Sequence, residues 1–338
     1  MLIDRLDVFT VREPVSRRQY SLVKLTTRDG VAGWGECSPL TAGDVDSARS
    51  MTARQPVHRY EVLRTRMENH PAQAAVNMAC LDAVGKMARA PVFQVLGGPT
   101  RNKVRALTDW SPAALKAGHR AFVVPLPEIT FPNPRRQFLS QVRERLEALR
   151  REAGDSADFV LDGNNQLPPG EAQNVSAAIE GLHPLWFDEP CALTNLGAAR
   201  KISEENVTPL GWGRHIRNLA EVQNLLREQM IDVVRLDLNR HGISSIRRAA
   251  ALAEAYYVAV APYHAGGPVG TAAAIHLAAS LPNFFIQQLP FAQGEDAKMR
   301  AELTGGDLEQ VRDGFLPLPA KAGLGVEINE STLRRNAA

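Results

Sequence analysis

The sequence predicts an α/β protein in which a small N-terminal α+β domain precedes a closed barrel of parallel strands. Three observations carry this prediction. Strand-like alternation fills about the first forty residues, a helical stretch that stops at two glycines follows, and short apolar runs then alternate with helical segments in a repeat of about 23 residues. A chain of 338 residues suits either one barrel with an attached domain or two medium domains.

The N-terminal domain is expected to cover residues 1–100. Period-2 alternation around the turn Arg28-Asp29-Gly30 indicates an antiparallel meander with strands at 2–9, 21–27 and 31–37. Residues 71–87 have the spacing of a helix with a small-residue face, and the run that follows them ends at Gly97 and Gly98.

The barrel is expected to cover residues 101–290. Its eight strands are predicted at 104–110, 121–127, 158–165, 185–190, 209–214, 232–238, 258–264 and 284–289. Helical segments such as 135–154 and 244–257 separate them. Strict alternation of eight strands with helices favours a closed parallel barrel over an open sheet. Residues 291–338 return to turns and short strands, and we expect them to pack back on the N-terminal domain.

Charge and cysteine content exclude several classes of protein. The formal net charge is +2 and no run of five or six like charges occurs, so neither nucleic acid nor a membrane surface is an expected partner. Cys37, Cys80 and Cys191 form no CxxC pair and are expected to be buried free thiols. The first residues lack the pattern of a secretory leader, which predicts a cytoplasmic protein.

Functional groups of such barrels gather where the strands end, because the loops after the strands form one rim. This rule selects Asp109, Asp162, Asn164, Asp188, Glu189, Arg214, His215, Asp237, Arg240, Tyr263, His264 and Gln288. Histidines outside the strand ends are expected to be structural: His58, His70, His119, His183 and His276.

Asp162 and Asp188 end the third and fourth predicted strands, so their carboxylates should lie close together. Two such carboxylates repel each other unless a cation or a proton lies between them. Mg²⁺ prefers oxygen ligands and would suit this place. The fifth strand, however, ends in Arg214.

Arg214 changes what this site can hold. Two carboxylates with one guanidinium carry the same net charge as Mg²⁺ with three carboxylates, so charge balances without a metal. Mg²⁺ about 4 Å from a guanidinium would feel roughly 8 kcal/mol of repulsion at an effective dielectric of about 20. We therefore favour a bridge from Arg214 to both aspartates. A metal site with Arg214 turned aside stays open, as does an ion-pair network that only stiffens the barrel.

A second pair of candidates lies on the sixth and seventh strands. Asp237 could orient and charge His264 for proton transfer. Tyr263 and His264 are consecutive, so only one of them points inward if the strand is regular. The glycine-rich residues 266–270 open a helix whose N-terminus could hold a substrate carboxylate, or be a plain helix start.

Several ordered motifs resemble the mandelate racemase and muconate lactonizing group of the enolase superfamily over essentially the whole chain. They are the hairpin GWGEC, the helix AAVNMACLDAVGK with its LGG exit, VLDGNN, WFDEP and the closing GLGVEI. The resemblance implies an N-terminal α+β capping domain and a modified (β/α)8 (TIM-like) barrel. It also implies Mg²⁺-assisted abstraction of a proton α to a carboxylate, and even-numbered homo-oligomers are common in this group.

Position by position, Asp162 and Asp188 match the first two metal ligands of that group, although the second is usually glutamate. Arg214 stands where the third acidic ligand belongs, which argues against the expected Mg²⁺. Asp237 matches the sixth-strand acid, and Tyr263 aligns best with the seventh-strand histidine. The second-strand lysine base is absent, since that strand reads AFVVPLP.

Together these observations predict a lyase or isomerase (a dehydratase, racemase or cycloisomerase) that acts on a small hydroxy-acid or acid sugar. The expected catalytic residues are His264, Asp237, Arg214 and Tyr263, and the expected substrate-binding residues are Asn164, Arg240, His215 and Asp109. Two alternatives stay open: an Mg²⁺ enzyme that uses Asp162 and Asp188, with or without Glu189 as a third ligand, and a barrel that binds a carboxylate without catalysis.

Overall fold

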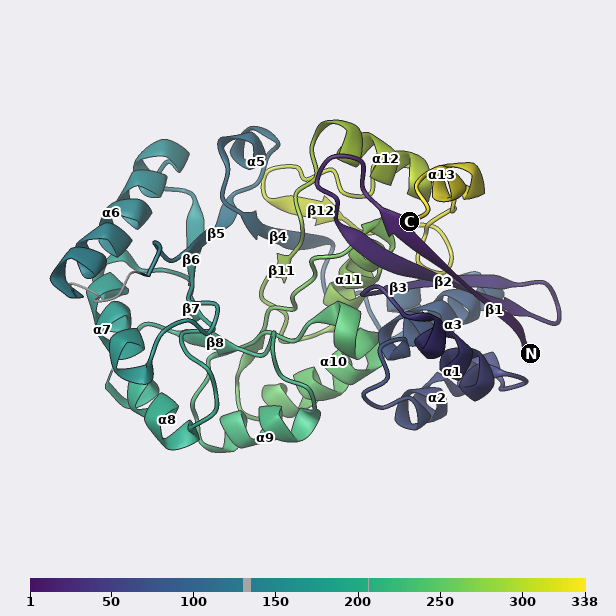
Figure 1. Cartoon of the computed structure of the whole chain (residues 1–338), viewed down its shortest axis with the longest axis horizontal. Coiled ribbons are helices and arrows are strands. Elements are labelled where there is room, and N and C mark those ends of the chain that lie inside the picture. The colour runs from purple at the N-terminus through teal and green to yellow at the C-terminus, as the bar shows by residue number, and fades with distance from the viewer. Residues whose placement is uncertain (130–134, 206) are drawn as a thin grey trace.

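The structure is a computed structural model that describes residues 1–129, 135–205 and 207–338. The N-terminal domain is a three-stranded antiparallel sheet covered by helices (Figure 1). Its strands are β1 (Ile3–Arg12), β2 (Gln19–Thr27) and β3 (Ala32–Cys37). Its helices are α1 (Ala42–Thr52), α2 (Tyr60–Arg66), α3 (Gln73–Ala88) and α4 (Val92–Val95), with a 3-10 turn at Val57–Arg59.

Close contact between β3 and α3 explains two of the predicted motifs. A Cβ atom at Gly33 would collide with the carbonyl of Ala79, and one at Gly35 would collide with the carbonyl of Ala75. The glycines of GWGEC and the alanine face of α3 therefore let the helix lie directly on the sheet. This contact confirms the meander and the small-residue helix that the sequence predicts.

The second part of the chain is a parallel barrel (Figure 1). Within the described residues its strands are β4 (Lys103–Asp109), β5 (Ala121–Pro125), β6 (Asp158–Asp162), β7 (Phe187–Asp188), β8 (Leu210–Trp212), β9 (Val233–Val234), β10 (Ala259–Val260) and β11 (Gln287–Gln288). They pair in chain order, β11 pairs with β4, and parallel bridges Val260–Phe284 and Tyr263–Gln288 join β10 to β11. The predicted (β/α)8-type barrel is confirmed.

Helices on the outside connect these strands, as the alternation of the sequence predicts. They are α5 (Pro112–Lys116), α6 (Arg135–Ala153), α7 (Pro169–Ile179), α8 (Leu196–Glu205), α9 (Leu219–Arg227), α10 (Leu238–Glu254) and α11 (Pro268–Ser280), with a 3-10 turn at Glu180–Leu182. Helix α10 is kinked at Gly242, whose φ of 69° lies in the left-handed region that favours glycine.

Strand register brings most of the candidate residues to one edge of the barrel, which we call the rim. Asp162 at the end of β6 lies opposite Asp188 at the end of β7. Bridges then join Asp237 to Tyr263 and Tyr263 to Gln288. Residues that are far apart in the sequence therefore meet because parallel strands end at the same side of the barrel.

The C-terminal segment contains α12 (Gly294–Thr304), β12 (Phe315–Pro317) and α13 (Glu330–Arg335). Strand β12 adds to β4 in the antiparallel sense. The chain then returns to the N-terminal sheet, where the backbone N–H of Ala338 donates to Thr10 and Lys24 pairs with Glu330.

Buried Asp82 on α3 joins three parts of the chain. Its carboxylate accepts hydrogen bonds from the backbone N–H of Trp34 (2.8 Å) and of Leu324 (2.7 Å), and it pairs with Lys86 (2.7 Å). The LDAVGK and GLGVEI motifs therefore meet at one carboxylate, which ties the C-terminal segment to α3 and β3.

Two simple predictions can also be checked. Cys37, Cys80 and Cys191 are free and buried, as expected. Among the described residues, no helix has both the length and the apolar character that crossing a membrane requires.

We expect Asp82→Ala to lower the free energy of unfolding by about 3–5 kcal/mol, because it leaves two buried N–H groups without their acceptor and Lys86 without its counter-charge. Urea-induced unfolding followed by circular dichroism measures this. Asp46→Ala on α1 is the matched control, since its side chain is 77% exposed, and should change stability by less than about 0.5 kcal/mol. Equal effects of the two substitutions would contradict the joining role of Asp82.

Candidate active site

The centre of the rim is the buried carboxylate of Asp188. One oxygen, Oδ1, accepts hydrogen bonds from Trp186 Nε1 (2.8 Å) and Arg235 Nε (2.8 Å). The other, Oδ2, accepts from Arg235 Nη2 (3.2 Å). Both Asp188 and Arg235 are fully buried, so this pair lies inside the barrel rather than on its surface.

Arg214 approaches the same carboxylate from the end of β8. Its Nε lies 3.2 Å from Asp188 Oδ2, and its Nη2 donates a hydrogen bond to Asp162 Oδ1. The side chain is only 9% exposed. The guanidinium thus lies between the two aspartates, which is the bridge that the sequence analysis favours, and it also lies 5.3 Å from the ring centre of Tyr263.

Arg235 is a charged group of this site that the sequence analysis missed. It lies between β9 and Asp237 in the segment VVRLD. In the sequence it is a single charged residue within an apolar strand, so the pattern did not select it. Besides Asp188, its Nη1 donates to the carbonyl of Ala261 and its Nη2 to Gln288 Oε1. An arginine at a strand position that should face the barrel interior is the signal that could have identified it, since a buried charge needs a partner.

Glu189, the third predicted acid, has a different role from its neighbours. Its Oε1 accepts hydrogen bonds from the backbone N–H groups of Gly213 (2.7 Å) and Arg214 (2.6 Å). Gly213 has φ of 147°, and a Cβ there would lie 2.8 Å from the backbone of Arg235. Glu189 therefore holds the backbone turn that directs Arg214 toward the aspartates.

The three carboxylates differ in their ionisation. Burial acts to raise the pKa of Asp188, but Arg235 and Arg214 outweigh it, and the pKa lies below its ordinary value. Burial raises the pKa of Asp162 despite Arg214, and the charge of Asp188 adds to the rise. Burial and Asp188 raise the pKa of Glu189 to about 7. Asp188 is thus the permanent anion of the group.

Asp237 and Tyr263 face the rim, whereas His264 does not. Asp237 caps α10 by accepting from the Asn239 N–H (2.9 Å), and burial raises its pKa to about 6. Burial also raises the pKa of Tyr263, with Arg214 opposing and Asp237 adding to the rise. The phenol therefore stays protonated at neutral pH.

The expected hydrogen bond between Asp237 and His264 is not formed. The ring of His264 is buried and contacts Asn239 Oδ1 (3.1 Å) through Nδ1 and the Gly267 carbonyl (2.9 Å) through Nε2. Burial lowers its pKa to about 4. Because consecutive residues of an extended strand face opposite ways, placing Tyr263 at the rim turns His264 toward the capping domain.

The glycine-rich start of α11 holds an anion, but the anion belongs to the protein. Glu36 of β3 accepts hydrogen bonds from the backbone N–H groups of Gly267 (2.5 Å) and Gly270 (2.9 Å). A Cβ at Gly267 would lie 2.8 Å from Glu36 Oε2. The open anion site suggested for a substrate carboxylate was therefore wrong, because the capping domain fills it.

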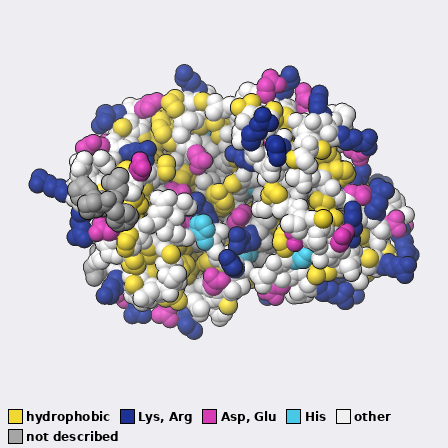
Figure 2. All heavy atoms as spheres, in the orientation of Figure 1, with side chains coloured by type: hydrophobic (Ala, Val, Ile, Leu, Met, Phe, Trp, Pro, Cys, Tyr) yellow, Lys and Arg dark blue, Asp and Glu magenta, His cyan; other side chains and the backbone are white. Residues whose placement is uncertain are grey.

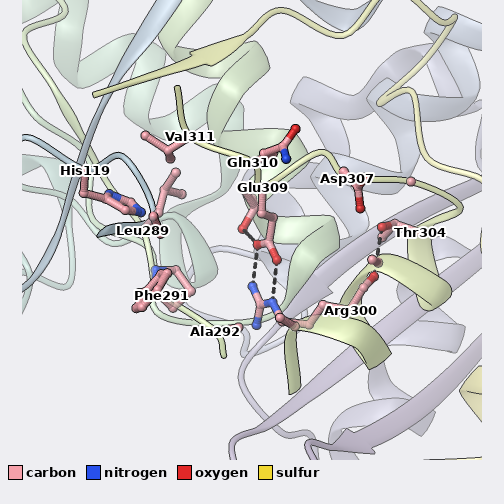
Figure 3. A pocket seen from close by; sticks show the side chains of 16 residues that line it. His119, Leu289, Phe291, Ala292, Arg300, Thr304, Asp307, Glu309, Gln310 and Val311 are labelled. Atoms are coloured by element: carbon pink, nitrogen blue, oxygen red, sulfur yellow. Dashed lines mark hydrogen bonds and ion pairs between the residues drawn. The ribbon is translucent and has the colours of Figure 1, made fainter. Parts of the chain in front are cut away.

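Next to this contact lies a cavity of about 380 Å³ that is separate from the rim. Figure 3 shows Arg300 extended toward Glu309 across one side of it, and their two hydrogen bonds are 2.6 Å long. Arg300 also donates to Glu13 (2.5 Å). Arg300 and Glu309, which line this cavity, thus neutralise each other.

The predicted substrate-binding residues lie around the rim with exposed side chains. Asn164 has φ of 44°, and its N–H donates to Asp162. Partial desolvation lowers the pKa of His215, and Arg214 and Arg240 add to this. Desolvation and the charge of Asp162 raise the pKa of Asp109. His215 and Asp109 therefore lie within electrostatic reach of Arg214 and Asp162.

Within residues 1–129, 135–205 and 207–338, no group of three or more His, Cys, Asp or Glu side chains is arranged to hold a metal ion. The Asp162 and Asp188 carboxylates instead meet guanidinium groups.

Comparison with known protein families agrees with the fold. Residues 113–332 match the model described as enolase C-terminal domain-like, and residues 5–97 match the N-terminal domain of mandelate racemase and muconate lactonizing enzyme. The chain belongs to the enolase superfamily. The resemblance predicted from its motifs is therefore confirmed.

Relatives of this superfamily member include sugar-acid dehydratases. It is 26% identical to a D-galactonate dehydratase family member of Streptomyces bingchenggensis, over 94% of this chain and 90% of the relative. It is 27% identical to a D-mannonate dehydratase of a Sphingomonas species, over 93% and 90% of the two chains. The crystal structure of a mandelate racemase/muconate lactonizing enzyme from Jannaschia superposes with a TM-score of 0.90 at 23% identity, covering 100% of this chain and 98% of that one.

Asp188→Asn should lower the free energy of unfolding by about 3–5 kcal/mol, because it leaves buried Arg235 without a counter-charge. Chemical denaturation monitored by tryptophan fluorescence measures the loss. Asp162→Asn is the matched control: Asp162 is 14% exposed, and Arg214 keeps Asp188 as a partner, so a loss of roughly 1 kcal/mol is expected. A larger loss for Asp162→Asn than for Asp188→Asn would contradict the central place of Asp188.

Proposed function

We propose that this enolase-superfamily enzyme is a lyase that eliminates water from an acid sugar, and that arginine supplies the positive charge at its reaction centre. The observation that carries the proposal is the guanidinium of Arg214 held between Asp162 and Asp188 under the ring of Tyr263. The curated relatives named as dehydratases of galactonate and mannonate support the substrate class.

The donor set suits guanidinium groups better than Mg²⁺. Both oxygens of Asp188 accept hydrogen bonds from Arg235, and one also accepts from Trp186. Asp162 Oδ1 accepts from Arg214 and from the Asn164 N–H. A hard cation here would have to displace these donors and lie beside two fixed positive charges. The residues present therefore do not fit a Mg²⁺ ion.

Arg214 has the geometry to bind a substrate carboxylate. Its Nη2 is directed at Asp162 and its Nε at Asp188, while its Nη1 has no hydrogen-bond partner among the described residues. A carboxylate that accepts from Nη1 would become an enediolate when its α-proton leaves, and the guanidinium would stabilise the added charge. Asp162 and Asp188 hold the guanidinium still during this change.

Two groups at the rim could move the protons of the elimination. Asp237, with a pKa of about 6, is ionised at neutral pH and could take the α-proton. Tyr263 has a raised pKa and could donate its proton to the departing β-hydroxyl group, which leaves as water. The enol that remains then becomes a ketone. His264 is buried, lies away from the rim and has no place in this sequence of steps.

The direct test is a screen of sugar acids for water elimination and for exchange of the α-proton with D₂O, followed by NMR. Elimination from at least one acid sugar is the expected result. Tight binding without exchange across the panel would favour a barrel that only binds carboxylates and would overturn the proposal.

Activity should depend on pH through Asp237. Because a base must be ionised to accept a proton, kcat/KM should rise as the pH increases through about 6 and should fall below it. Asp237→Asn should lower kcat/KM by about 100-fold to 10,000-fold, and its residual activity should lack this limb. A limb near pH 6 that persists in Asp237→Asn would assign the base elsewhere. Tyr263→Phe, with normal stability, should lower kcat and keep the limb.

Removal of divalent metal should leave activity within about two-fold, whereas Arg214→Gln should lower kcat by about 100-fold to 1,000-fold, as loss of one transition-state donor does. Assays after EDTA dialysis, with and without millimolar Mg²⁺, measure the first effect. Activity that disappears with EDTA and returns with Mg²⁺ would instead support the alternative in which Asp162, Asp188 and Glu189 hold a metal.

A further inference from the structure

A cavity of about 550 Å³ lies between the capping domain and the barrel. The capping domain contributes Ser38, Asn69 and His70 to its wall, and the barrel contributes Arg217, Asn218 and Arg240. Its volume is within the range of about 300–1,000 Å³ that small-molecule sites occupy. Unlike the cavity beside Arg300, its wall includes no Asp or Glu among the described residues.

The two arginines of this cavity are free cations. Among the described residues, neither Arg217 nor Arg240 has an ion pair or a side-chain hydrogen bond, and both are exposed. By contrast, Arg214, Arg235 and Arg300 are all paired with carboxylates. Figure 2 shows Lys and Arg side chains beside His and acidic ones near the middle of the face, where the barrel meets the capping domain. The cavity wall therefore carries two arginine charges and, in the part of the chain that the structure describes, no carboxylate of its own.

The barrel side of the cavity wall comes from residues that follow rim residues closely in the chain. Arg217 follows Arg214 by three residues in the loop between β8 and α9, and Arg240 follows Asp237 by three residues in the first turn of α10. Arg240 and Arg214 both act to lower the pKa of Asp237 and of His215, so both guanidinium groups lie near these two residues of the rim. A ligand held at Arg214 has this cavity as a place for its far end.

We propose that this cavity binds a second carboxylate at the far end of the substrate, so that the substrate is a sugar diacid rather than a sugar mono-acid. The inference rests on the proposed function, because it takes one carboxylate to be held at Arg214. Guanidinium groups bind carboxylates by charge-assisted hydrogen bonds, whereas a terminal hydroxyl group would leave both cations without a partner. His70 and Asn218 can hydrogen-bond the hydroxyl groups between the two ends.

The experiment compares two sugar acids that differ only at the far end. Galactarate carries a carboxylate where galactonate carries a hydroxymethyl group, and isothermal titration calorimetry at fixed ionic strength measures the Kd of each. We expect galactarate to bind about ten-fold to a hundred-fold more tightly, as a charge-assisted hydrogen bond provides. Glucarate and gluconate repeat the comparison with another configuration of the hydroxyl groups.

Variants assign the preference to the cavity. Arg240→Gln and Arg217→Gln should each weaken galactarate binding by about ten-fold or more and leave galactonate binding within about two-fold. Arg248→Gln is the matched control, because Arg248 is an exposed arginine of the same helix that does not line the cavity. Circular dichroism establishes that the variants are folded.

Three results would overturn the inference: equal affinity for diacid and mono-acid, equal weakening of both ligands in the variants, or no binding of either diacid at millimolar concentration. Binding and turnover separate the two proposals. A diacid preference that depends on Arg217 and Arg240, without water elimination, would keep the cavity assignment and overturn the proposed reaction. Water elimination from mono-acids and diacids that bind with equal affinity would keep the proposed reaction and overturn the cavity assignment.

Discussion

The arrangement of the rim depends on the ion pair between Asp188 and Arg235 inside the barrel. Both side chains are removed from water, so each would be very unfavourable without the other. Trp186 also donates a hydrogen bond to Asp188 Oδ1, and its ring lies 5.0 Å from the guanidinium carbon of Arg235. With this anion fixed, Arg214 has a permanent partner and can lie between β6 and β8.

This arrangement also explains why carboxylates on adjacent strands can coexist at the rim. Asp162 and Asp188 end neighbouring strands, and Arg214 after β8 and Arg235 after β9 share their charge. Arg214 is directed by Glu189 through the backbone of its own turn, and Arg235 is directed by Gln288 and Ala261. Both guanidinium groups are therefore held in place by contacts within the protein chain.

Much of the fold follows from the sequence because the spacing of apolar residues and the positions of glycines are local properties of the chain. The alternation of strands and helices predicts the barrel, and the glycines of GWGEC and the alanines of α3 predict their contact. The end-of-strand rule finds Asp162, Asp188, Arg214, Asp237 and Tyr263 at one rim. Arg235 was missed because the rule selects strand ends, whereas this residue reaches the site from within the barrel.

The partners of individual side chains were harder to predict, because they depend on contacts between distant segments. The pairing of His264 with Asn239 and Gly267 follows from which way the extended chain turns at Tyr263. The carboxylate at the start of α11 comes from Glu36, more than two hundred residues earlier in the chain. Nothing in the local pattern around Gly267 indicates that an acid from β3 would reach it.

The contact between Glu36 and α11 has an evolutionary consequence. Gly267 and Gly270 leave room for this one carboxylate and donate both of its backbone hydrogen bonds, so each domain is complete only with the other. A chimaera that joins this capping domain to a barrel with larger side chains at these two positions would bury an anion without its donors. Exchange of domains by recombination is therefore compatible with this contact only where the new barrel also keeps the two glycines.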